Sequence, residues 1–154
     1  MKRVPAYLAA VFLATASACG GSDDEAFVNR MDELCGSANE IHEDYGAQFQ
    51  SIPDTPEAVA DFFERQLSEL TVVYAEIQAL DPPADDAEAF GRLQDQIRDS
   101  EEIARNGIDA FRDGDLEEAE RIIGLNNDLL AAQQATFAEL GLADTECTRV
   151  QEAG

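Results

Sequence analysis

Four long amphipathic segments, separated by helix-breaking residues, constrain the fold of this chain most strongly. Apolar residues recur every three or four positions over residues 23–50, 56–80, 85–112 and 116–140, the spacing that places them on one face of an α-helix. No segment alternates apolar and polar residues for long, as a strand would. The sequence therefore predicts an all-α protein, a four-helix bundle with up-down-up-down topology.

Residues that start or stop helices mark the boundaries between these segments. Thr55 and Pro56 suit the N-cap and the first position of the second helix, and the prolines at 82–83 end it. Gly114 and Asp115 predict a turn followed by a new N-cap. The connections are short, which favours antiparallel neighbours in the bundle.

The N-terminal region has the three zones of a secretory signal. Lys2 and Arg3 precede an apolar run over residues 4–14, and small residues then lead to Cys19. The apolar run is far shorter than the roughly 20 residues that a membrane-spanning helix needs. We therefore expect residues 1–18 to be removed as a signal peptide and the mature protein to be exported.

Cys19 is the expected lipid-attachment site. Ala16-Ser17-Ala18-Cys19 is similar to a bacterial lipobox, although Ala16 stands where that pattern prefers Leu. The same residues suit ordinary signal peptidase, so secretion without lipid is the alternative. Residues 19–24 are interpreted as the lipidated Cys and a flexible tether, 25–147 as the bundle and 148–154 as a tail. The expected location is the extracytoplasmic face of the cell membrane, with the protein held by its lipid.

The cysteine count predicts one disulfide. The chain has three cysteines, Cys19, Cys35 and Cys147, and lipidation of the first leaves a pair for an oxidising compartment. For Cys35 and Cys147 to meet, the tail has to fold back along the first helix. The alternative is two free thiols in a metal or redox site, but neither cysteine belongs to a C-x-x-C pair.

The chain is strongly acidic. Its formal net charge is −23, and removal of Lys2 and Arg3 makes it −25. Such a surface repels nucleic acid and anionic lipid head groups, so no nucleic-acid partner is expected. The favoured interpretation is that the charge keeps an exported domain soluble; attraction of cations or basic partners is the alternative.

The sequence gives little support to catalysis or metal binding. His42 is the only histidine, and Asn39 stands where a di-iron bundle would need Glu; we expect His42 at the surface or at a helix flank. Acidic groups over residues 81–88 and 113–118 offer oxygen ligands for Ca²⁺, but acidic helix starts explain them equally well. We expect no metal, no cofactor and no enzymatic activity.

Two amides lie on the apolar line of the fourth segment, at Asn126 and Gln133. If they face inward, each needs a hydrogen-bond partner, which Ser100 or Asn106 would supply. The favoured interpretation is a network that fixes helix register. The alternative is a small polar pocket in the bundle interior, with these site residues: Tyr45, Tyr74, Asn126 and Gln133.

The arrangement of helix-capping and helix-breaking residues resembles that of small secreted lipoproteins of actinobacteria. The shared features span residues 35–147: Cys35 early in the first helix, Leu80-Asp81-Pro82-Pro83, Gly114-Asp115, and Leu140-Gly141-Leu142 before Cys147. The resemblance supplies no catalytic residues. We expect a non-enzymatic protein-interaction or binding module with a protein partner in the envelope; the alternative is a small-ligand carrier that uses the bundle interior.

Overall fold

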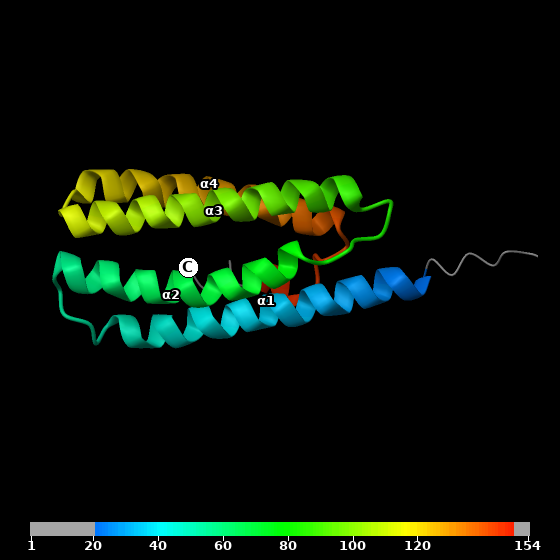
Figure 1. Ribbon diagram of the computed structural model, residues 1–154, viewed down its shortest axis with the longest axis horizontal. Helices are drawn as coiled ribbons and strands as arrows, with labels where there is room; N and C mark the ends of the chain where they lie inside the picture. Colours follow the sequence, from blue (N-terminus) through cyan, green and yellow to red (C-terminus); the bar gives the residue numbers. More distant parts are fainter. Residues whose placement is uncertain (1–20, 150–154) are drawn as a thin grey trace, which may run out of the picture.

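The computed structural model describes residues 21–149, and this part of the chain is all-helical. Its helices are α1 (Gly21–Phe49), α2 (Pro56–Gln78), α3 (Ala87–Asp113), α4 (Leu116–Glu139) and the short α5 (Glu146–Arg149). The four long helices alternate in direction and form two pairs, α1 with α2 and α3 with α4 (Figure 1). The predicted four-helix up-down-up-down bundle is confirmed.

The start of α1 differs from the expectation. The helix begins at Gly21, so residues 21–24 of the expected flexible tether are helical. Asp23 and Asp24 lie in the first turn, where negative side chains interact favourably with the helix dipole. The predicted signal peptide and Cys19 lie outside the described residues.

Two predicted helix starts are confirmed in detail. Thr55 accepts a hydrogen bond from the Ala58 N–H (3.3 Å) at the start of α2. Gly114 ends α3 with a φ of 71°, a conformation that glycine adopts without steric cost. Asp115 then caps α4 by accepting from the Glu118 N–H (3.1 Å). Local sequence therefore places these breaks correctly.

The helices do not pack evenly around the bundle. α2 packs on α1 and α3, α3 packs on α4, and α1 packs on α2 and α5 rather than extensively on α4. Exposed arginines bridge three of the four helix edges, through the pairs Arg30–Glu76, Arg112–Glu64 and Arg92–Glu139. Among the described residues, no ion pair joins α1 to α4. The α1–α4 edge, here called the seam, is therefore the loosely closed side of the bundle.

The predicted Cys35–Cys147 disulfide is present, and it holds α5 at this seam. Gly141, with a φ of 73°, turns the chain after α4. The Glu146 N–H then donates to Asp32 Oδ1 (2.6 Å), and Asn39 Nδ2 donates to the Glu146 carbonyl (2.9 Å). Residues 141–149 thus fold back along α1, as the cysteine spacing requires.

The orientation of α4 corrects part of the apolar line predicted for residues 116–140. Leu116 and Ile123 lie on that line by their spacing, which predicts burial, but they are 63% and 52% exposed, whereas Ile122 is 5% exposed. Gly107 of α3 explains this rotation, because a Cβ there would lie 3.3 Å from Ile122 Cγ2. The missing side chain lets Ile122 approach α3 closely, and its neighbour Ile123 turns outward.

None of the helices in residues 21–149 combines the length and the apolar character that crossing a membrane requires.

Candidate binding cavity

A cavity of about 330 Å³ lies in the half of the bundle farthest from the start of α1. It is lined mainly by α2, α3 and α4, and α1 contributes His42. The cavity follows from the open seam: α5 is only four residues long and covers the seam near Cys35, so it does not reach this half. We call this space the main cavity.

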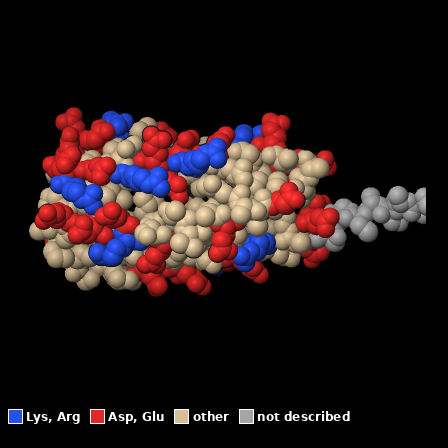
Figure 2. Space-filling model, in the orientation of Figure 1, with Lys and Arg blue, Asp and Glu red and all other residues tan. Residues whose placement is uncertain are grey.

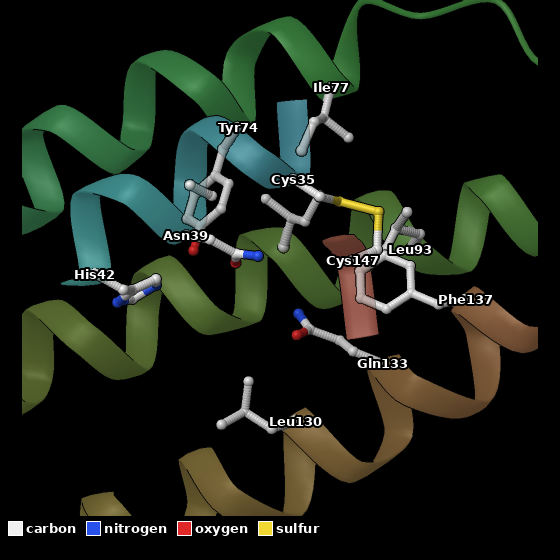
Figure 3. Close-up of a pocket in the computed structure, with 12 residues that line it drawn as sticks. Cys35, Asn39, His42, Tyr74, Ile77, Leu93, Leu130, Gln133, Phe137 and Cys147 are labelled. Carbon is white, nitrogen blue, oxygen red and sulfur yellow. A yellow bond between two sulfur atoms is a disulfide. The ribbon is translucent and has the colours of Figure 1, made fainter. Parts of the chain in front are cut away.

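A smaller space of about 90 Å³ adjoins the main cavity beside the disulfide. Cys35 and Cys147 are part of its wall, with side chains from all four long helices around it (Figure 3). The two spaces share wall residues His42, Tyr74, Leu130 and Gln133. We call the smaller space the inner cavity and treat the two as one site.

Most of the wall is apolar, from residues such as Phe63, Leu70, Ile108 and Phe111. Against this background stand a few polar side chains with no formal charge. These are His42, Gln66, Tyr74, Ser100, Asn126 and Gln133 in the main cavity, and Asn39 in the inner cavity. An apolar wall with a few convergent polar groups is typical of small-molecule sites.

Gln133 belongs both to the core and to the cavity wall. It is 8% exposed, and its Nε2 donates to Ser100 Oγ (3.0 Å) and to the Gln96 carbonyl (3.4 Å). The predicted partner Ser100 is therefore correct, and the alternative partner Asn106 is exposed instead. This contact joins α4 to α3, and Gln133 also lies in the cavity wall. Gln133 therefore fits both predictions made for it, a network that fixes helix register and a polar pocket.

Asn126 lines the main cavity at partial exposure. Its side chain takes part in none of the hydrogen bonds found among the described residues, which leaves its amide available to a ligand. Tyr45, by contrast, does not line either cavity: its ring packs edge-on against Phe62 and its hydroxyl donates to Glu69 Oε1 (2.7 Å). Tyr45 therefore belongs to the α1–α2 interface and not to the site.

His42 was expected at the surface or at a helix flank, and no role in a site was predicted for it. It is partly buried, it contacts Gln66 on α2, and it lines both cavities. Gln66 Nε2 lies 3.1 Å from His42 Nδ1; in this arrangement the Gln66 amide donates, and the neutral ring carries its proton on Nε2. Burial lowers the pKa of His42, which favours this neutral donor at physiological pH.

Tyr74 is the second titratable group of the wall. Burial is the main cause that raises its pKa to about 12, and the negative charge of Glu101 adds to the effect. The phenol therefore stays protonated across the physiological range. The hydroxyl is a neutral hydrogen-bonding group beside an otherwise apolar surface.

Metal-ligating side chains do not gather in the described part of the chain. Within residues 21–149, no three or more His, Cys, Asp or Glu side chains gather in a metal-binding arrangement. Acidic side chains instead spread over the outer surface (Figure 2). Of the acidic residues considered for Ca²⁺, Glu88 in the first cluster pairs with Arg92, whereas in the second cluster Asp115 caps α4 and Glu118 pairs with Arg121. The acidic groups therefore serve helix ends and the surface.

The sequence contained a signal for part of this site. Gln133 and Asn126 were identified because a polar group on an apolar helix face is unusual, and Tyr74 was named with them for the alternative pocket. Asn39 was noted only as the residue that stands where a di-iron site would need Glu. Comparison with protein-family models, with curated proteins and with solved structures gives no match for this chain.

Proposed function

We propose that this domain is a non-enzymatic carrier that binds a small, mainly apolar molecule in the main and inner cavities. The observation that carries the proposal is the main cavity itself. Its volume of about 330 Å³ falls in the range of roughly 300–1,000 Å³ that small-molecule sites occupy. Well-packed interiors contain few voids larger than a water molecule, so a space of this size favours ligand binding over a purely structural bundle.

The proposed setting is the extracytoplasmic face of a cell membrane. The signal-like N-terminus and Cys19 support a lipid anchor, and the Cys35–Cys147 disulfide is consistent with an oxidising compartment. The cavity begins near His42, roughly 30 Å along α1 from Gly21 at 1.5 Å per residue. An anchored domain would therefore hold its cavity well clear of the lipid surface.

A second candidate is a protein-interaction module, the function that the sequence alone favoured. Its support is the set of exposed apolar side chains on α4, Leu116, Ile123 and Leu125. Exposed apolar groups of this kind mark partner surfaces when they are contiguous. Ile123 also lines the main cavity, so this surface meets the rim of the proposed ligand site.

Ligand binding can be tested with Nile red, an uncharged apolar dye, and a variant that fills the cavity. Ala104 lines the main cavity, and Ala104→Leu should weaken dye binding about ten-fold because the added atoms occupy ligand space. Ala75 is exposed on α2, so Ala75→Leu is the matched control and should bind as the unmodified protein does. The dye should also stabilise the fold by about 2.7 kcal/mol at a concentration 100 times its Kd.

Two results would reject the carrier. One is dye fluorescence that does not saturate; the other is saturable binding that both leucine variants retain equally. The second result would place the dye on an outer surface, and the exposed face of α4 would then be the first surface to test.

A further inference from the structure

Asn39, in the wall of the inner cavity, carries a buried hydrogen-bond acceptor that has no protein partner. Asn39 is 8% exposed. Its Nδ2 donates to the Glu146 carbonyl (2.9 Å) and approaches Glu146 Oε2 (3.3 Å), which fixes the direction of the amide. Its Oδ1 is buried and accepts no hydrogen bond within the described residues. Leaving such a group unpaired costs about 1–3 kcal/mol, so a ligand that donates to it would recover this energy.

The position of Asn39 connects this acceptor to the proposed ligand site. Asn39 lines the inner cavity together with Tyr74 and His42, which are two of the four residues that line both spaces. Figure 3 shows Asn39 on α1 and Gln133 on α4 projecting toward the same space. The polar end of a ligand would therefore lie in the inner cavity and its apolar part in the main cavity.

The walls also restrict the charge of the ligand. No Asp, Glu, Lys or Arg is among the residues that line either cavity, so a buried carboxylate or ammonium group would lose its hydration without gaining a counter-ion. Glu101, whose negative charge acts on Tyr74, further disfavours an anion. The polar group that fits is neutral and carries a hydrogen-bond donor.

We propose that the cavity selects an uncharged, mainly apolar alcohol, whose hydroxyl donates to Asn39 Oδ1 while its hydrocarbon part fills the main cavity. A hydroxyl also accepts a hydrogen bond, so it can use a donor from Tyr74 or His42 at the same time. This inference rests on the proposed carrier function and adds the chemical class of the ligand.

The test compares four probes of similar size in competition with Nile red on the mature protein. 1-Decanol carries the donor; its isomer nonyl methyl ether keeps the oxygen and lacks the donor; decanoate and decylammonium carry opposite charges. 1-Decanol should bind about five-fold more tightly than the ether, the effect of one net hydrogen bond. Both charged probes should bind more weakly than 1-decanol.

Substitution of Asn39 tests whether this residue causes the preference. Asn39→Ala removes the acceptor, and the alcohol-to-ether ratio of affinities should fall to about one. Because this change also removes the bond to Glu146, Asp32→Ala is the matched control: it removes the other bond that holds Glu146 and should keep the five-fold ratio.

Equal affinities for 1-decanol and the ether in the unmodified protein would overturn the alcohol proposal and leave the carrier intact. Tighter binding of decanoate or decylammonium would also overturn it. Failure of every probe to displace a dye that itself binds saturably would overturn the alcohol proposal alone, whereas absence of saturable dye binding would reject both proposals.

Discussion

At the scale of single residues, the surroundings of a side chain decide whether it serves the cavity or helix packing. Tyr74 and Tyr45 have the same phenol, but Tyr74 lines the cavities whereas Tyr45 hydrogen-bonds to Glu69 between α1 and α2. The pKa of both is raised, mainly by burial for Tyr74 and mainly by the hydrogen bond to Glu69 for Tyr45. The same residue type therefore serves the site in one place and helix packing in the other.

The raised pKa of Tyr74 predicts a loss of stability at high pH. In the unfolded chain the phenol ionises near pH 10, but in the folded protein it ionises at about 12. The folded state therefore binds the phenol proton more tightly than the unfolded chain does, which stabilises the fold. This contribution to the free energy of unfolding is complete below pH 10 and declines as the pH rises toward 12. The loss should reach about 3 kcal/mol, measured by urea unfolding at a series of pH values.

Tyr74→Phe is the control for this measurement. It removes the ionisable group, so the decline between pH 10 and 12 should shrink to the part that Tyr45 contributes. Lys2, in the predicted signal peptide, is the only lysine, so lysine titration does not complicate the mature chain. A phenolate absorbance that shows both tyrosines of the folded protein ionising near pH 10 would contradict the prediction.

At the scale of elements, α5 closes one part of the seam and leaves the other open. It is too short to be a stable helix in isolation, and its contacts with α1 include the Cys35–Cys147 bond, a hydrogen bond that Glu146 N–H donates to Asp32, and one that Asn39 donates to the Glu146 carbonyl. The cysteines are separated by 112 positions, so their bond crosslinks nearly the whole bundle. Stability and cavity shape thus depend on the same short segment.

Removal of this crosslink should destabilise the domain markedly. The double variant Cys35→Ser/Cys147→Ser should lose about 4–5 kcal/mol of unfolding free energy, because the unfolded chain is no longer constrained over so long a loop. Denaturant unfolding with and without a reductant measures this. The unmodified protein should lose stability on reduction, whereas the variant should not respond. Equal stability of the two proteins under oxidising conditions would show that α5 is held by its other contacts alone.

At the scale of the whole molecule, charge and apolar surface are separated between outside and inside. Among the described residues no charged side chain is buried, and acidic groups are spread over the face that Figure 2 shows, whereas the cavity walls carry no acidic or basic side chain. An acidic exterior keeps the domain apart from anionic head groups. If Cys19 is lipidated as proposed, that lipid supplies the attachment to the membrane. The proposed carrier would then be tethered to a membrane that its own surface repels.

The intact mass of the protein from its own host, extracted gently and without reductant, tests this arrangement. The expected mass is that of residues 19–154 with acyl chains added and two hydrogens removed for the disulfide. Reduction should return the two hydrogens and leave the acyl mass in place, which serves as the internal control. A mature protein without acyl chains would contradict the anchor and leave Cys19 as a free thiol.

Much of the fold was determined by the sequence itself, because its causes are local. The spacing of apolar residues, the caps at Thr55 and Asp115 and the turn at Gly114 act within a few residues of each other, so they predicted four helices and their order. The disulfide was also predictable, since pairing follows from the number of cysteines and the expected compartment.

The candidate site was decided only by the tertiary structure. Which face of α4 is buried depends on Gly107 lying opposite Ile122, a contact between helices that periodicity does not register. His42 and Asn39 became cavity residues because α1 does not pack on α4 beyond α5, and Tyr45 was excluded because it turns toward α2. A helix pattern specifies which side chains need burial, whereas a cavity arises where packed elements fail to meet, and that depends on the whole arrangement.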